Sequence, residues 1–195
     1  KNITQKEFLK LRSDWLIKNS NLELIEEYLI TNQILDFHPK LTKYLIDEYL
    51  SEANIQKACE IFRKNLKPIN DDYLTKFNIY CLINEKKIEE AQLLYDLKKE
   101  LGMIDDPYFE NKINFLMGFT SKIDETISEK NILYFHLAHR VNPKFTFEPK
   151  NNTSKIIWKY LSSSNLLNSL QQTEISNLDR KSTRLNSSPR CISYA

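Results

Sequence analysis

The sequence predicts an all-α protein, a right-handed stack of antiparallel helical hairpins with about 9–11 helices and no β-sheet. Apolar residues recur at helical spacing along most of the 195 residues. Glycine is rare, with Gly102 and Gly118 as the only two. Tight β-hairpin turns and phosphate-binding glycine loops are therefore not expected. The third observation is an apolar pattern that repeats at a fixed interval, equal to the sequence distance between Phe8 and Leu41.

The first hairpin is expected over residues 5–33. Thr4 and Glu7 have the spacing of a capping box, in which each side chain accepts a hydrogen bond from a backbone N–H at the start of a helix. After this cap, four apolar residues fall on one helix face, which we expect to be buried: Phe8, Leu11, Trp15 and Leu16. The second helix presents Leu22, Ile25, Tyr28 and Leu29.

Two further hairpins are expected over residues 38–66 and 71–102. Pro39 suits the first turn of a helix, and Pro68 breaks the helix before it. Gly102 is a natural C-cap for the last helix. The apolar positions that define these four helices are Leu41, Tyr44, Leu45 and Tyr49; Ile55, Ala58, Cys59 and Phe62; Leu74, Phe77 and Cys81; and Ile88, Ala91, Leu94 and Tyr95.

The three hairpins align in sequence without a gap, because the step from the first to the second equals the step from the second to the third. Seven sets of equivalent positions are apolar or aromatic throughout: Phe8, Leu41 and Leu74; Leu11, Tyr44 and Phe77; Leu16, Tyr49 and Leu82; Ile17, Leu50 and Ile83; Leu22, Ile55 and Ile88; Ile25, Ala58 and Ala91; Leu29, Phe62 and Tyr95. A lone hairpin cannot bury its apolar face, so this period favours a solenoid of stacked hairpins. A non-repeating bundle of helices of similar length is the alternative.

The period resembles that of tetratricopeptide-type repeats over residues 5–102. Ala58 and Ala91 fit the resemblance, because each is followed four residues later by an aromatic residue. The glycine of that family's first helix is replaced by Ile46 and Ile79, and its closing proline is absent. The resemblance implies a stack of helical hairpins more than it implies a function.

A looser resemblance covers residues 55–167. Tyr80, Cys81 and the run at residues 90–94 are similar to an uncharacterised helical family of alphaproteobacteria, often labelled "antifreeze glycopeptide polyprotein". Nothing in the sequence resembles an ice-binding surface, which would need regular arrays of Thr or Ala. The resemblance implies a bacterial source and no activity.

Beyond the third hairpin the period ends, and irregular helices are expected over residues 106–170. A helix beginning after Asp106 is closed by Gly118, and residues 132–140 form the next. Ser154 is expected to cap a further helix. Residues 165–170 could add a last short one.

Residues 179–195, DRKSTRLNSSPRCISYA, resemble the translation of a short-read sequencing adapter. We expect them to be a non-native, disordered tail after a single domain at residues 1–178, and both ends of the native protein to be missing. The tail carries four basic residues and one acidic residue, so without it the formal net charge changes from +2 to −1. Binding to nucleic acid, which needs a clustered basic surface, is therefore not expected.

No catalytic, cofactor-binding or metal-binding residue is predicted. His136 and His139 lie three apart on an expected helix, but zinc needs at least one more ligand. We expect a surface or partly packed pair, and a structural role for His38 in a turn. The acidic pairs are interpreted as capping or solvent-facing residues, as expected for helix starts and polar faces: Glu26-Glu27, Asp71-Asp72, Glu89-Glu90 and Asp105-Asp106.

Cys59 and Cys81 lie on helices that neighbour each other in a repeat stack. They are interpreted as buried thiols, which are common on apolar faces. In an exported protein they could instead form a disulfide that joins adjacent repeats. A catalytic cysteine is not expected, because no recognisable motif supplies a histidine or acidic partner.

These observations favour a non-catalytic scaffold that binds a protein or peptide along the concave surface of the stack. The alternative is the helical part of an exported bacterial enzyme, such as a cell-wall lytic enzyme, whose catalytic domain lies outside this fragment. No membrane span is expected, because no apolar run approaches the roughly 20 residues that a bilayer requires. The sequence is compatible with a periplasmic and with a cytoplasmic location.

Overall fold

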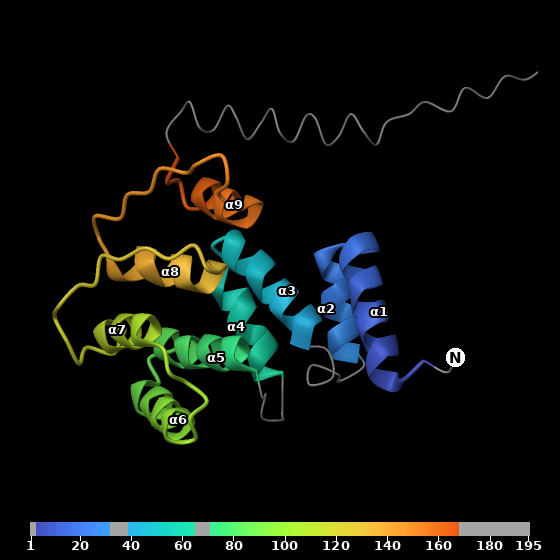
Figure 1. The fold of residues 1–195 in the computed structure, drawn as a ribbon, viewed down its shortest axis with the longest axis horizontal. Helices are drawn as coiled ribbons and strands as arrows, with labels where there is room; N and C mark the ends of the chain where they lie inside the picture. The colour runs from blue at the N-terminus through green and yellow to red at the C-terminus, as the bar shows by residue number, and fades with distance from the viewer. Residues whose placement is uncertain (1–2, 32–38, 65–70, 168–195) are drawn as a thin grey trace, which may run out of the picture.

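The computed structural model describes residues 3–31, 39–64 and 71–167, and within these ranges the chain is all-helical, without a strand (Figure 1). The predicted all-α class is confirmed. The helices of the described ranges are α1 (Gln5–Asn19), α2 (Leu22–Thr31), α3 (Pro39–Ser51), α4 (Ile55–Arg63), α5 (Asp72–Asn84), α6 (Ile88–Glu100), α7 (Pro107–Leu116), α8 (Ile132–Val141) and α9 (Lys155–Ser163). None of these is long and apolar enough to cross a bilayer. The expectations for His38, the adapter-like tail and residues 168–170 lie outside the described residues.

Helix starts follow local capping chemistry. The predicted capping box is present at α1, where the Thr4 N–H donates to Glu7 Oε2 at 2.9 Å and the Glu7 N–H donates to Thr4 Oγ1 at 3.3 Å. Asp71 caps α5 by accepting from the Leu74 N–H at 2.9 Å, and Asp106 caps α7 in the same way. Ser154 occupies the N-cap position of α9, but its side chain makes no capping hydrogen bond.

Helix boundaries repeat with the step that the apolar pattern predicts. The helices α2, α4 and α6 begin at equal intervals, at Leu22, Ile55 and Ile88. Ala53 and Lys86 are separated by the same interval, and each adopts a positive φ, 56° and 64°, at the turn of its hairpin. The first hairpin differs, because Ser20 at the matching position has a φ of −117°. Two hairpins therefore share one turn geometry, and the first uses another.

The helices that open each hairpin lie against one another, since α1 contacts α3, α3 contacts α5, and α5 contacts α7. The later helices α8 and α9 fold back across this row, and both pack on α3 (Figure 1). Lys159 on α9 forms ion pairs with Glu48 at 2.7 Å and Glu52 at 2.9 Å on α3. Parts of the chain that are far apart in sequence thus meet at α3.

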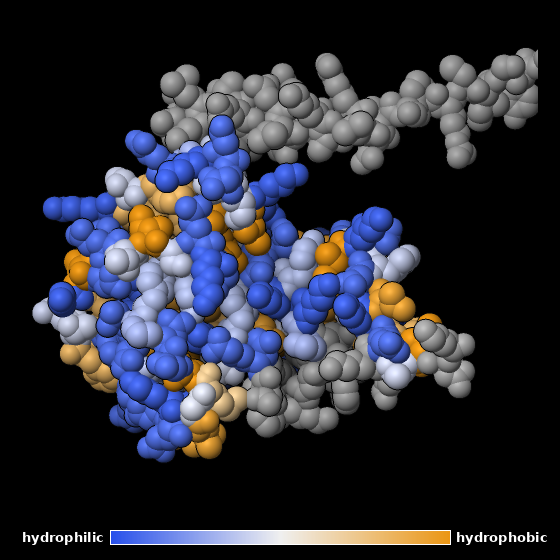
Figure 2. Space-filling model, in the orientation of Figure 1, coloured by the Kyte–Doolittle hydropathy of each residue, from blue (hydrophilic) through white to orange (hydrophobic). Residues whose placement is uncertain are grey.

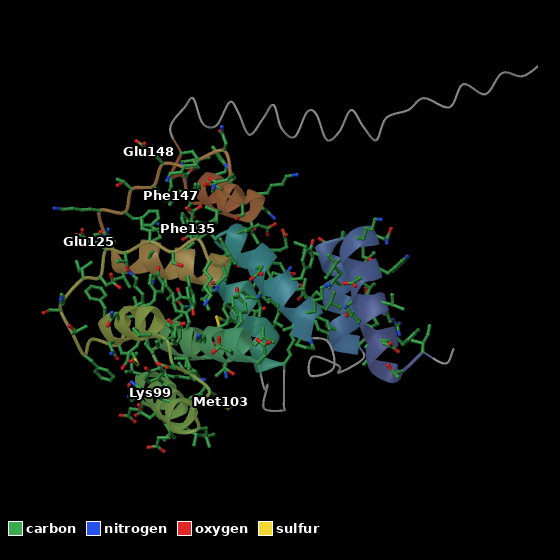
Figure 3. The ribbon with its side chains drawn as sticks, viewed as in Figure 1. Lys99, Met103, Glu125, Phe135, Phe147 and Glu148 are labelled. Carbon is green, nitrogen blue, oxygen red and sulfur yellow. A yellow bond between two sulfur atoms is a disulfide. The ribbon has the colours of Figure 1, made fainter. Side chains whose placement is uncertain are left out.

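The core is centred on α3, α5 and α8, and α8 is buried on nearly all sides. Phe135 of α8 is wholly buried and packs edge-on against Phe145 and Phe147 from the segment that follows the helix (Figure 3). Such edge-to-face pairs stabilise beyond the burial of their area. The irregular segment after α8 is therefore held to the core by aromatic packing.

The predicted buried face of α1 is wrong for three of its four residues, and the fourth, Leu16, is partly buried. Phe8, Leu11 and Trp15 are 53%, 58% and 61% exposed. The buried side of α1 instead runs through Ser13, which is almost fully buried, and the partly buried Ile17. α1 contacts α3, and the face that α1 buries is not its most apolar one.

Candidate functional site

A pocket of about 460 Å³ opens where α8 and α9 meet the turn between α3 and α4 and the end of α5. We call it the α8 pocket, and its lining residues are Ala53, Ile55, Gln56, Tyr80, Asn84, His136, His139, Arg140, Tyr160 and Ser164. Its volume lies within the range of about 300–1,000 Å³ that is typical of ligand sites. No carboxylate is among the lining residues.

The floor of the α8 pocket is a continuous chain of hydrogen bonds. The Tyr80 hydroxyl lies 2.7 Å from Nε2 of His136, and Nδ1 of the same imidazole lies 2.9 Å from the Tyr160 hydroxyl. The Tyr160 hydroxyl also lies 2.7 Å from Nδ1 of His139. Because residues three and four apart share a helix face, α8 presents His136, His139 and Arg140 to the same pocket.

Burial keeps this chain uncharged near neutral pH. Burial lowers the pKa of His136 to about 3, and the positive charge of Arg140 and the neighbouring His139 act in the same direction. The pKa of His139 is also lowered, mainly by burial and then by Arg140. Burial raises the pKa of Tyr80 to about 12 and that of Tyr160 still further. The pocket therefore carries one permanent charge among these residues, on Arg140.

The prediction that both histidines lie at the surface or are partly packed is wrong for His136, which is only 5% exposed. It is correct for His139, which is partly buried beside Phe145. Within the three described ranges, no group of three or more His, Cys, Asp or Glu side chains is arranged to hold a metal ion. The two imidazoles instead hydrogen-bond to tyrosines from α5 and α9.

Of the two states that the sequence leaves open for the cysteines, the structure contains the disulfide. Cys59 of α4 and Cys81 of α5 are bonded to each other, with their Cα atoms 5.5 Å apart. Both residues are buried. The bond ties the second hairpin to the third and leaves neither sulfur as a free thiol.

Two buried lysines are functional candidates that sequence reasoning missed. Nζ of Lys76 donates to Asp72 at 2.8 Å, to Asp106 at 2.7 Å and to the Tyr134 hydroxyl at 3.1 Å. These three contacts use all of the donors of an ammonium group. Burial alone would lower the pKa of Lys76, but the three hydrogen bonds outweigh burial and raise that pKa. This lysine therefore joins α5, α7 and α8 and has no donor left for a substrate.

Lys112 of α7 is completely buried. Its Nζ donates to the backbone carbonyls of Asp124 and Thr126, the latter at 2.9 Å, and lies 3.6 Å from a carboxylate oxygen of Asp124. Burial lowers the pKa of Lys112, and Asp124 opposes this effect. The lysine holds the irregular segment between α7 and α8 in place, which is a structural role.

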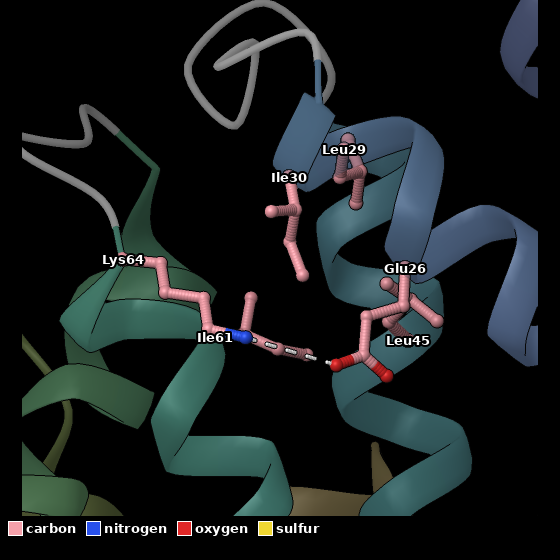
Figure 4. A pocket seen from close by; sticks show the side chains of 6 residues that line it. All are labelled: Glu26, Leu29, Ile30, Leu45, Ile61 and Lys64. Carbon is pink, nitrogen blue, oxygen red and sulfur yellow. Dashed lines mark ion pairs between the residues drawn. The ribbon is translucent and has the colours of Figure 1, made fainter.

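A second cavity, between α2, α3 and α4, measures only about 10 Å³ (Figure 4). Its walls are mainly apolar, with Leu29, Ile30 and Leu45 on one side, and a Glu26–Lys64 ion pair of 4.0 Å crosses its edge. A volume of roughly 10–15 Å³ is the minimum that holds one water molecule. This cavity is therefore too small for a ligand.

Apolar side chains are exposed on two outer helices. The first group is Phe8, Leu11 and Trp15, which we call the α1 strip, and Figure 2 shows apolar surface gathered at the edge of the molecule formed by α1. The second group is Leu93, Leu97 and Leu101 at the edge formed by α6. Contiguous exposed apolar surface marks interaction sites more often than single apolar residues do.

No family model, curated protein or solved structure significantly matches this chain.

Proposed function

We propose that this protein is a non-catalytic scaffold of tetratricopeptide-like helical hairpins that binds another protein through the α1 strip. Two features support the repeat architecture. The helix starts at Leu22, Ile55 and Ile88 are evenly spaced, and the opening helices of successive hairpins contact one another. Such arrays present extended surfaces for partner proteins.

Because other helices cover α3, we do not place the binding surface on the concave side of the stack that the sequence suggests. Both α8 and α9 pack on α3, the central helix of the row. The ion pairs from Lys159 to Glu48 and Glu52 fasten this cover. A partner that docked on α3 would have to displace two helices, whereas the α1 strip is open.

The α1 strip carries the proposal. Its residues lie at positions i, i+3 and i+7, so Phe8, Leu11 and Trp15 project from one face of the helix. All three are more than half exposed. Fully burying such a side chain stabilises by about 1.5–3 kcal/mol, so completing their burial is worth several kcal/mol in total. Tryptophan is also among the residues that dominate binding energy at interfaces.

The surroundings of the α1 strip indicate the partner's chemistry. With 3.6 residues per turn, Arg12 and Lys18 fall on opposite sides of the strip. Lys18 has no ion-pair partner among the described carboxylates, and Arg12 stacks on Tyr28 at 4.6 Å. A helix with an apolar stripe and acidic flanks would bury the strip and pair with both cations. We therefore assign an amphipathic, acidic-flanked helix as the partner.

A displayed library of amphipathic helical peptides tests the proposal. Peptides enriched on the protein should bind in solution with micromolar affinity and carry acidic residues beside their apolar stripe. Trp15→Ala should weaken them at least tenfold in fluorescence anisotropy. Leu97→Ala, a matched substitution on the exposed face of α6, should leave their affinity unchanged. The proposal fails if the library yields no specific peptide, or if the selected peptides bind the Trp15→Ala protein as well as the wild type.

One observation favours a second candidate function, the helical part of an exported enzyme. The Cys59–Cys81 disulfide is typical of proteins that fold in an oxidising compartment. The complete reading frame decides the matter, because the candidate requires a catalytic domain in the same polypeptide. A frame without such a domain removes this candidate.

A further inference from the structure

We propose that the α8 pocket binds a small carboxylate ligand, held by Arg140 and His139. This site goes beyond protein binding through the α1 strip. It lies between the turn that joins α3 to α4 and the helices α5, α8 and α9, and none of the α1 strip residues lines it. The two sites can therefore be tested independently.

The charge of the α8 pocket favours an anionic ligand. Arg140 lies on its rim, and no carboxylate lines the wall. The ion pairs among the described residues include none to Arg140, and two acidic residues of α3, Glu48 and Glu52, are both paired with Lys159. A guanidinium that faces a pocket without a carboxylate partner favours an anionic group from a ligand.

The hydrogen-bond chain on the floor of the α8 pocket has a direction. Among the described residues, the hydrogen-bond partner of the buried Tyr80 hydroxyl is Nε2 of His136, so the Tyr80 O–H donates to that nitrogen. Neutral His136 therefore carries its proton on Nδ1 and donates to the Tyr160 oxygen. The Tyr160 O–H in turn donates to Nδ1 of His139, so that imidazole carries its own proton on Nε2.

This direction determines what the pocket offers to a ligand. Nε2–H of His139 has no hydrogen-bond acceptor among the described residues, and His139 is only partly buried. Gln56 and Asn84 add side-chain amide donors to the same wall. The polar groups at the opening thus include several N–H donors and a single full positive charge. One charge and a planar guanidinium suit a singly charged, planar carboxylate better than a doubly charged phosphate.

The remaining wall of the α8 pocket is partly apolar. Ala53, Ile55 and the rings of Tyr80 and Tyr160 supply apolar surface beside the donors. A pocket of about 460 Å³ has room for a ring-sized apolar body attached to the carboxylate. Benzoate combines both features and is the probe of choice. Benzamide has the same ring and shape without the charge.

Titration followed by NMR tests the assignment on the full chain. Benzoate should shift the His139 ring and Arg140 side-chain signals in a saturable way, with a Kd in the millimolar range. Benzamide and inorganic phosphate should bind at least tenfold more weakly. Arg140→Met should weaken benzoate at least tenfold, and the exposed position of Arg140 makes it tolerant of substitution. Arg12→Met on α1 is the matched control and should leave the Kd unchanged.

The alternative outcomes are distinct. Equal binding of benzoate and benzamide would overturn the carboxylate assignment, and so would tighter binding of phosphate. Benzoate shifts that survive in the Arg140→Met protein would place the anion elsewhere. Trp15→Ala should leave the benzoate titration unchanged, because Trp15 does not line the α8 pocket. Loss of peptide binding and loss of benzoate binding are therefore separate results.

Discussion

Reduction of the Cys59–Cys81 disulfide should lower the free energy of unfolding by about 3 kcal/mol. The bond closes a loop with a sequence separation of 22. In the chain-entropy description of disulfides, closing a loop of this length removes roughly 11 cal/mol/K from the unfolded state, which is about 3 kcal/mol at 25 °C. This is a large share of the stability of an ordinary domain, for which about 5–15 kcal/mol is typical. The reduced protein should therefore remain folded but be clearly weakened.

Urea denaturation followed by far-UV circular dichroism measures this loss. With a slope of about 2 kcal/mol/M, the midpoint should fall by about 1.5 M when reductant is added. A Cys59→Ala/Cys81→Ala variant is the control, and its midpoint should not respond to reductant. All measurements belong in a Cys191→Ser background, which prevents thiol exchange. Equal midpoints with and without reductant would refute the reasoning, as would labelling of both thiols in denatured, unreduced protein.

Three further predictions concern other positions. Because burial lowers the pKa of His136 to about 3 in the folded protein, acid protonates this imidazole in the unfolded chain but not in the folded protein. The contribution of neutral His136 to the free energy of unfolding is therefore present above pH 6.5, and it falls by about 2 kcal/mol between pH 6.5 and 5. A His136→Asn variant should lack that part of the pH dependence, and identical slopes would contradict it. Lys112→Met should lower the free energy of unfolding, measured by urea denaturation, by about 3 kcal/mol, because two backbone carbonyls lose their hydrogen-bond donor. The exposed Lys122→Met should lower it by less than about 0.5 kcal/mol. An equal loss of stability in the two variants would disprove the structural role of Lys112. Ala53→Gly and Lys86→Gly should each raise the free energy of unfolding by about 0.5–1 kcal/mol, and with it the thermal midpoint, because both residues adopt a positive φ. A lower midpoint would argue against backbone strain at these turns.

The sequence predicts the helices well because capping is a local effect. Thr4 and Asp71 act within three residues of their own position, so their spacing alone identifies helix starts. The orientation of α1 is not local. Phe8 and Trp15 mark the most apolar face, but the buried residue is Ser13, because burial depends on how α1 lies against the rest of the chain, including α3.

The candidate site was harder to predict, because its partners are distant in sequence. The spacing of His136 and His139 is visible, yet Tyr80 lies 56 positions from its imidazole partner and Tyr160 lies 24 away. Lys76 is similar, since its contact to Tyr134 spans 58 positions. Only the folded chain shows that these residues meet, and burial then keeps the two imidazoles uncharged near neutral pH.

The packing of α8 and α9 on α3 changes how the molecule should come apart. In an array whose units contact only their neighbours, hairpins can unravel from one end, and the stability of each is nearly its own. Here Lys159 bonds to Glu48 across 111 positions, so α3 reaches its final surroundings only after α9 has been synthesised. Amide hydrogen exchange should accordingly show α3 and α9 opening together, with a common free energy. The middle of the chain therefore depends for its final packing on a helix that is synthesised later.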